Sequence, residues 1–208
     1  MLKHIILILI LSFALQAQQF DGDRDYYYTV KSSEYEQVDT LALYNSEGHR
    51  PTMYTSSWDF NARNTIKRYS SLEIPIMQTD STVLLKMPFT GYLSDLGKIP
   101  YPQLNFSMKG GDSIYIEQSY IKYGDNHQRD SINIRGYIKM VDYQEKLVND
   151  KVVKTWKLEA YNSDNPDYRA TYTYSSEYGF VNFKYYLAGK EVEIDHYTTY
   201  HNVSILGN

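Results

Sequence analysis

The chain has 208 residues and a formal net charge of −4, and it contains no cysteine. The missing cysteines exclude disulfides, thiol catalysis and lipid attachment through a cysteine at the mature N-terminus. Because nucleic-acid binding without sequence preference depends on clustered lysines and arginines, the mildly acidic balance argues against a nucleic-acid partner. Tyrosine is the compositional outlier, with 23 residues, and it favours half-buried sheet surfaces.

The N-terminus has the pattern of an export signal. A short polar start precedes an apolar run over residues 5–15, which is shorter than the roughly 20 residues that a membrane-spanning helix needs. We interpret residues 1–17 as a secretory signal peptide cut after Ala17, with a cut after Ala14 as the alternative and an uncleaved anchor as the rival. Since no later apolar run reaches membrane length, we expect a mature chain without a transmembrane span, exported to the periplasm or outside a bacterium.

After the signal, residues 18–208 suffice for a single domain, and a polar stretch marks a candidate sub-boundary at residues 119–131. In the first part, alternating apolar and polar residues predict strands at 26–31, 38–44 and 51–55. Residues 58–68 show no clear period, so we interpret them as a loop or a short helix.

A hairpin is predicted over residues 72–89, with a turn at Asp80 and Ser81. It pairs Gln78 with Val83, Ile76 with Leu85, Ile74 with Met87 and Leu72 with Phe89. Residues 90–102 contain several helix and strand breakers and read as a long connection.

The next predicted hairpin covers residues 103–118 and turns at the loop Gly110, Gly111 and Asp112. This loop length sets Met108 against Ile114 and Phe106 against Ile116. Further along, the apolar phase changes at Gly136, which we interpret as a bulge.

The clearest element is a hairpin over residues 137–161 with a two-residue turn at Asn149 and Asp150, residue types that tolerate the left-handed conformation. It pairs Val148 with Lys151, Leu147 with Val152, Glu145 with Lys154, Tyr143 with Trp156, Asp142 with Lys157 and Val141 with Leu158. Each such pair contributes roughly 0.2–1 kcal/mol, so together they fix the register. A helix over 141–148 is the rival interpretation.

Near the C-terminus, residues 168–174 alternate as a strand, and a last hairpin turns at Ala188 and Gly189. It pairs Tyr185 with Val192, Lys184 with Glu193, Phe183 with Ile194 and Val181 with His196. Short turns and regular strand spacing predict an all-β fold of antiparallel hairpins, arranged as a curved sheet, a half-barrel or an extended β-sandwich.

Aromatic residues are the candidates for ligand binding, because exposed rings can stack on sugars or on a protein partner. The candidate ligand-binding residues are Trp58, Tyr26, Tyr28, Tyr197 and Tyr200. Ordinary sheet packing is the competing explanation for all of them.

Catalytic and metal-binding patterns are weak. Asp195, His196 and His201 could form a metal site only if the strand bends, so we expect no metal and no cofactor. The carboxylates of Asp39, Glu117 and Glu159 are expected to be solvated.

The sequence therefore predicts an exported, soluble, non-catalytic β-domain that binds a ligand or partner in the bacterial cell envelope. An apolar small molecule, a glycan and an envelope protein are the candidate partners. A glycan-directed envelope hydrolase with an unidentified carboxylate or histidine site is the alternative.

Overall fold

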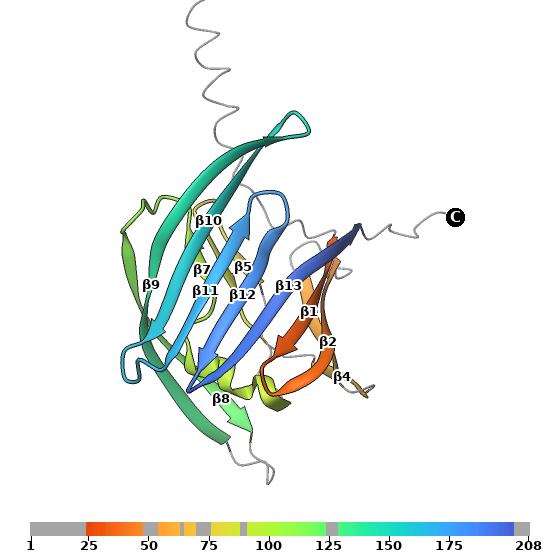
Figure 1. Cartoon of the computed structure of the whole chain (residues 1–208), viewed down its shortest axis with the longest axis vertical. Helices are drawn as coiled ribbons and strands as arrows, with labels where there is room; N and C mark the ends of the chain where they lie inside the picture. The colour runs from red at the N-terminus through yellow and green to blue at the C-terminus, as the bar shows by residue number, and fades with distance from the viewer. Residues whose placement is uncertain are drawn as a thin grey trace, which may run out of the picture.

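The computed structural model of the protein describes residues 24–47, 54–62, 65–69, 76–87, 91–123 and 129–201. Within these ranges the chain forms antiparallel strands and a 3-10 helix, η1 (Gly91–Lys98). The all-β prediction is confirmed, since the strands form one large curved sheet and one small sheet (Figure 1).

Ten strands make up the large sheet, in the order β4-β3-β2-β1-β13-β12-β11-β10-β9-β8. Their bounds are β1 (Arg24–Ser32), β2 (Tyr35–Glu47), β3 (Tyr54–Ala62), β4 (Thr65–Tyr69), β8 (Ser113–Tyr123), β9 (Arg129–Val148), β10 (Lys151–Asn162), β11 (Tyr168–Ser175), β12 (Gly179–Leu187) and β13 (Lys190–His201). The small sheet consists of β5 (Ile76–Gln78), β6 (Thr82–Leu85) and β7 (Gln103–Asn105), in that order. Among the described strands, β4 and β8 are therefore the edges of the large sheet.

The core lies between the concave face of the large sheet and a cover made by the small sheet and η1 (Figure 1). Leu85 of β6, Leu93 of η1 and Leu104 of β7 are fully buried in one cluster with Tyr and Phe side chains of the large sheet. The alternation predicted for residues 168–174 is confirmed, because Ala170, Tyr172 and Tyr174 are buried in β11. Tyrosine-rich strands thus supply much of the core.

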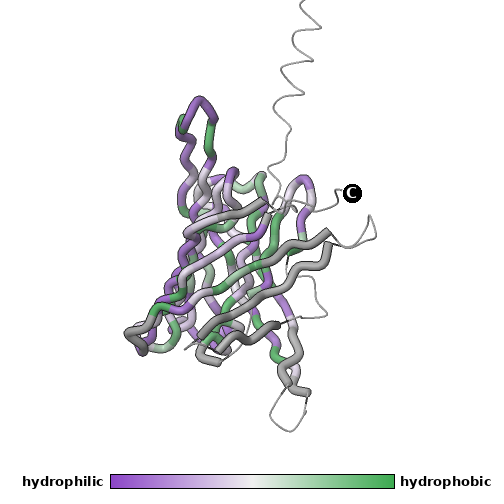
Figure 2. The backbone as a smooth tube through the Cα atoms, turned by 90° about the vertical axis from the view of Figure 1, so that its right-hand side faces the viewer, coloured by the Kyte–Doolittle hydropathy of each residue, from purple (hydrophilic) through white to green (hydrophobic). Residues whose placement is uncertain are grey.

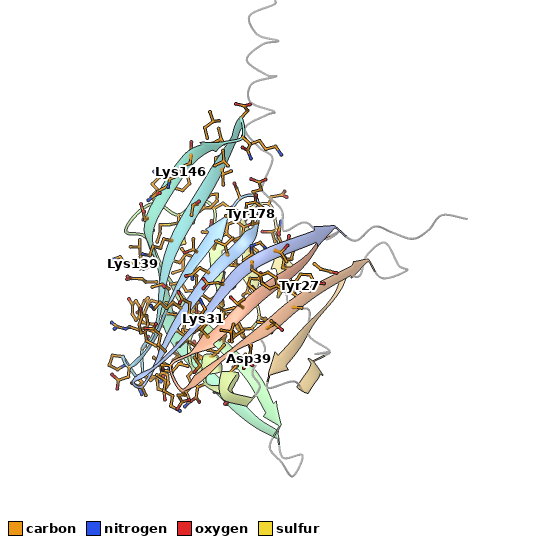
Figure 3. All side chains as sticks on the ribbon, turned by 45° about the vertical axis from the view of Figure 1, so that its right-hand side comes forward. Tyr27, Lys31, Asp39, Lys139, Lys146 and Tyr178 are labelled. Carbon is orange, nitrogen blue, oxygen red and sulfur yellow. The ribbon has the colours of Figure 1, made fainter. Side chains whose placement is uncertain are left out.

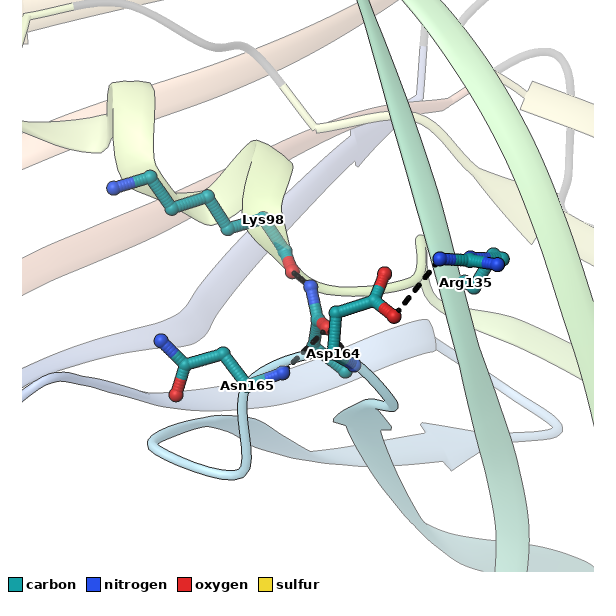
Figure 4. A network of polar contacts seen from close by, with 5 residues as sticks. Lys98, Arg135, Asp164 and Asn165 are labelled. Atoms are coloured by element: carbon teal, nitrogen blue, oxygen red, sulfur yellow. Dashed lines mark hydrogen bonds and ion pairs between the residues drawn. The ribbon is translucent and has the colours of Figure 1, made fainter.

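A polar network fastens the end of η1 to the loop that follows β10 (Figure 4). Asn162 Nδ2 donates to the carbonyl of Lys98 at 2.7 Å, while its Oδ1 accepts the N–H groups of Asp164 and Asn165 at 2.7 and 3.0 Å. Arg135 on β9 donates to the Asp164 carboxylate at 3.1 Å. The cover is thereby held against β9 and β10 at this end of the molecule.

The register of the β9–β10 hairpin is confirmed from the turn to residue 142. Tyr143 lies opposite Trp156 and Glu145 opposite Lys154, and both turn residues, Asn149 and Asp150, have positive φ. Residues 141–148 are strand, so the helical alternative was wrong.

The bulge in this hairpin lies elsewhere than predicted. Leu158 pairs with Met140 rather than with Val141, which is the extra residue, and the register runs without a shift through Gly136. A Cβ at Gly136 would overlap the carbonyl oxygen of Tyr161 and lie 2.7 Å from the ring of Pro100. Gly136 is therefore needed because the segment that follows η1 packs closely on β9 at this residue, and not because of a bulge.

Two other hairpins agree with their predicted register. Ile76 pairs with Leu85 and Gln78 with Val83 in the small sheet. Phe183 pairs with Ile194, and Tyr185 with Val192, across β12 and β13. The predicted pairs of Leu72, Ile74 and Phe89 lie outside the described residues.

The hairpin predicted over residues 103–118 was wrong. β7 pairs with β6 and β8 pairs with β9, so the glycine-rich segment connects two different sheets instead of closing one hairpin. Residues 58–68, predicted as a loop or short helix, contain β3 and β4 paired to each other. The connection predicted at 90–102 contains η1.

Asp39 also differs from its prediction. Its side chain is 3% exposed, on the same face of β2 as the buried Leu41 and Leu43. At the candidate sub-boundary, β8 and β9 pair with each other from Ser113 opposite Lys139 to Tyr123 opposite Arg129. Both strands therefore belong to the same sheet on either side of residues 124–128.

Candidate functional site

The five predicted aromatic residues do not form one surface. Tyr26 and Tyr28 are 1% and 0% exposed, so neither presents a ring at the protein surface. The side chains of Trp58 and Tyr200 lie outside the described residues. Tyr197 is 54% exposed and contacts the ring of Tyr27, with 6.2 Å between ring centroids.

Tyr26 and Tyr28 instead pack around His196. The ring of His196 lies 6.3 Å from Tyr26, 5.7 Å from Tyr28 and 5.9 Å from Tyr178, which stacks on it from the solvent side. Burial raises the pKa of Tyr28 well above the ordinary tyrosine range and lowers the pKa of His196. His196 is therefore a half-buried histidine packed among aromatic rings. The described residues contain no group of three potential metal ligands.

A cleft of about 310 Å³ lies between the edge strand β8 and the small sheet. One wall is formed by consecutive residues 115–119 of β8. The other is formed by Leu84, Lys86, Tyr101 and Gln103, from β6, β7 and the segments next to them. Because consecutive strand residues point to opposite faces, a cleft lined by five in a row runs along the strand's edge and contacts its backbone.

The backbone bonding of β9 shows which groups of β8 face this cleft. The N–H of Ser163 donates to the carbonyl of Arg135 at 2.8 Å, so Arg135 directs its backbone groups toward β10. Its neighbour Gly136 directs them toward β8, where it lies opposite Ile116. Residues of an antiparallel strand point their backbone groups alternately toward and away from the paired strand. In β8, the N–H and C=O groups that point away from β9 and into the cleft therefore belong to Tyr115, Glu117 and Ser119.

The cleft combines apolar surface with several polar groups. Leu84 and Ile116 supply apolar walls, and Lys86 and Glu117 supply one charge of each sign. The Oε1 atom of Gln118 accepts the N–H of Tyr101 at 3.3 Å. Its Nε2 atom is buried, and within the described ranges no acceptor lies in hydrogen-bonding distance of it. A ligand carbonyl entering the cleft could accept this bond.

Three tyrosines form a row on the exposed face beside the cleft. Tyr115, Tyr137 and Tyr161 lie opposite one another on β8, β9 and β10. Tyr137 is 5.3 Å from Tyr115 and stacks on Tyr161 at 5.5 Å, and the three side chains are between 37% and 52% exposed. Since Tyr115 also lines the cleft, the row and the cleft form one continuous surface.

Sequence reasoning missed this surface for a physical reason. The cleft joins β8 to two earlier segments, next to β6 and β7, and only the segment that contains β7 was predicted to pair with β8. The tyrosine row depends on the relative register of three strands. The predicted register would have set Tyr161 opposite Ile138, and the unpredicted bulge at Val141 brings it opposite Tyr137.

No family model matches the sequence, and no curated protein is significantly similar to it. Among solved structures, the chain is similar to the hypothetical lipoprotein YmcC from Escherichia coli, with 13% identity and a TM-score of 0.39 over 95% of this chain and 97% of that one. A likeness of this degree says nothing about function. In the described part of the chain, none of the helical structure has the length and apolar character needed to cross a membrane.

Proposed function

We propose that this chain is an exported, non-catalytic binding protein of the bacterial cell envelope that holds an extended segment of a partner protein along β8. The export signal predicted for residues 1–17 supports the location. The observation that carries the binding role is that none of the described strands pairs with the edge of β8 that lines the cleft. An extended peptide adds to such an edge as one more strand, and the hydrogen bonds of its main chain supply the affinity.

The side chains of the cleft would select the peptide. Alternate residues of an added strand point to opposite faces, so one set faces Leu84 and Ile116 on the covered side. The other set lies near Tyr115 and Glu117 on the exposed face. This arrangement favours peptides that alternate apolar and polar residues, with a basic residue near Glu117.

A proline substitution tests strand addition directly. Peptides selected from a random display library against the full mature chain provide the probe, and their binding is measured by fluorescence polarisation. Glu117→Pro removes an N–H that points into the cleft and none from the β8–β9 ladder. We expect binding to weaken about tenfold, equivalent to ~1.4 kcal/mol, because one strand-to-peptide bond is lost and the ring obstructs its neighbour.

Ser113→Pro is the matched control. Ser113 lies on the same edge of β8, and by the same alternation its N–H also points outward, but it does not line the cleft. The proposal predicts unchanged peptide binding for this variant. Equal weakening by both prolines, with both variants folded by circular dichroism, would show that the cleft edge is not where the peptide binds.

Glycan binding is the second candidate, and the row of Tyr115, Tyr137 and Tyr161 favours it. Exposed aromatic rings side by side can stack on the apolar faces of sugars. Tyr137→Ala, which removes the central ring, should abolish retention on immobilised polysaccharides while leaving peptide binding intact. The opposite pattern would assign the surface to the peptide alone.

The hydrolase alternative has no matching arrangement in the cleft. Glycoside hydrolysis uses two carboxylates that flank the scissile bond. Among the residues that line the cleft, Glu117 is the single carboxylate. A binding role therefore fits this cleft better than hydrolysis does.

A further inference from the structure

The turn end of the β9–β10 hairpin projects from the body of the molecule as an arm, residues 141–153 (Figure 1). β8 pairs with β9 only as far as Lys139, and β11 pairs with β10 only from Thr155 onward. Residues 141–152 are all exposed, and Leu147 is 70% exposed. Hydrophobic stretches lie on both strands next to the polar turn (Figure 2). The arm is therefore a two-stranded ribbon, a structure that is marginal in water by itself.

Both sides of the arm's base are fixed. The ring of Tyr143 contacts Trp156, which is buried against Phe106 and Tyr174. At the outer edge of β9, Met140 exchanges backbone bonds with the segment before β8, donating to Asp112 at 2.8 Å. The edge of β9 is thus occupied up to Met140, and beyond it no strand in the described ranges pairs with this edge.

The open edge has a definite set of backbone groups. In a hairpin with a two-residue turn, Val148 and Lys151 form a hydrogen-bonded pair, so the backbone groups of Val148 point toward β10. Backbone direction alternates along a strand, so the N–H and C=O groups of Glu145, and of the residues two positions before and after it, point away from β10. The N–H of Tyr143 donates to the carboxylate of Asp142 at 2.8 Å, which is consistent with its pointing away from β10. The outward-facing residues are Tyr143, Glu145 and Leu147.

We propose that two copies of this chain pair through this edge, arm against arm, in antiparallel orientation. The open stretch runs from residue 141, beyond Met140, to residue 147, before the turn at Asn149. Its midpoint is Gln144. With a two-fold axis at Gln144, each residue from 141 to 147 in one copy lies opposite a residue of the same stretch in the other copy. The two marginal ribbons then form one four-stranded sheet.

The sequence of the arm is complementary to itself in this register. Asp142 of one copy lies opposite Lys146 of the partner subunit, twice by symmetry (Figure 3 shows Lys146 on the arm). Val141 lies opposite Leu147 of the partner subunit, so the most exposed apolar residue of the arm gains an apolar neighbour. Tyr143 and Glu145 form the bonded pairs on either side of the axis.

Neighbouring registers are unfavourable. An axis at Asp142, Glu145 or Lys146 would place two like charges directly opposite each other, which destabilises an antiparallel pair. An axis at Tyr143 would bring residues 146–148 against positions 138–140, whose outer edge is already paired with β8 and Asp112. The axis at Gln144 brings only Val148, the last residue before the turn, to Met140. The length of the open stretch and the positions of its charged residues therefore both place the two-fold axis at Gln144.

The natural chain has no cysteine, so single cysteines report the pairing without interference. In antiparallel strands, opposite Cα atoms are about 4.5–5.5 Å apart, within the range that a disulfide bridges. Gln144→Cys should therefore form a disulfide-linked dimer under mild oxidation. The wild-type mature chain should elute with twice the monomer mass in size-exclusion chromatography with light scattering.

Lys146→Cys is the matched control, on the same face and with similar exposure. Its two copies would lie about 13 Å apart, four residues along the strand, and should not cross-link. A mixture of Lys146→Cys and Asp142→Cys chains should cross-link. A monomeric wild-type chain at high concentration, or cross-linking of Lys146→Cys alone as fast as that of Gln144→Cys, would overturn the proposal; in the latter case the contact would be with another surface.

Discussion

The two ends of the β9–β10 hairpin share one continuous ladder but have opposite surroundings. At the base, Met140, Trp156 and Leu158 are buried under the small sheet and beside β8 and β11. On the arm, Leu147 and Val152 pair with each other across the strands and remain 70% and 55% exposed. Hydrogen-bonded pairing is therefore the same at both ends, and only the neighbouring strands and the covering layer differ.

This difference separates two contributions to the stability of a β-sheet protein. The base gains from burial of apolar area, which stabilises by about 25 cal/mol per Å². The arm gains only from the ladder and its cross-strand pairs, and its free edges and apolar side chains remain available to a partner. The predictions that follow compare substitutions at the base with substitutions on the arm.

The largest effect is expected at the base. Trp156→Ala removes a side chain that is 5% exposed and contacts Phe106, Tyr143 and Tyr174. We expect the free energy of unfolding to fall by ~3–5 kcal/mol, because a large core cavity forms. Urea denaturation followed by circular dichroism measures it, and a loss below about 1 kcal/mol would mean that Trp156 is not part of the packed core.

A smaller loss is expected for Gly136→Ala, also at the base. The added methyl group would overlap the carbonyl oxygen of Tyr161 and the ring of Pro100. Overpacking of this kind costs about 1–3 kcal/mol. Gly110→Ala is the matched control, since nothing lies within 4 Å of a Cβ there. Equal stability of the two variants would contradict the close packing at Gly136.

Tyr143 stands at the junction of base and arm and should give a titration signal. Partial burial and the hydrogen bond to Glu145 raise its pKa to about 12. Because the folded pKa lies above the unfolded value of about 10, the stability from Tyr143 is complete below pH ~10 and is lost as the pH rises to about 12. The difference in ultraviolet absorbance between wild type and Tyr143→Phe should have its midpoint there; a midpoint near 10 would place Tyr143 in water.

The smallest effect is expected on the arm. Leu147→Ser changes a side chain that is mostly in water, so in dilute solution the free energy of unfolding should change by less than about 0.5 kcal/mol. The same denaturation experiment measures it. A loss comparable to that of Trp156→Ala would show that the arm is covered by its own chain.

The sequence predicts hairpins well where charges and aromatic residues have partners across a tight turn. The β9–β10 register follows from Glu145 facing Lys154 and Tyr143 facing Trp156, both close in sequence. Prediction from sequence fails at Gly110 and Gly111, where a glycine-rich segment has the residues of a tight turn but connects two sheets. Local pattern cannot distinguish the two cases, because the partners of β7 and β8 are chosen by tertiary packing.

The candidate site was less predictable than the fold. Tyr26 and Tyr28 were chosen as surface rings, but the alternation of β1 places them in the core, and a tyrosine run alone does not reveal which face is covered. The cleft beside β8 depends on how the small sheet rests on the large one. Such an arrangement of layers is not encoded in any short stretch of residues.

Residue-resolved amide hydrogen exchange along β8 tests the central claim, that an unpaired strand edge forms the binding surface. In the free protein, the amides of Tyr115, Glu117 and Ser119 should exchange fast, while those of Ile116 and Gln118, bonded to β9, exchange slowly. A selected peptide should slow the first set and leave the second unchanged. Slow exchange of both sets in the free protein would contradict the account, because the edge would already be occupied.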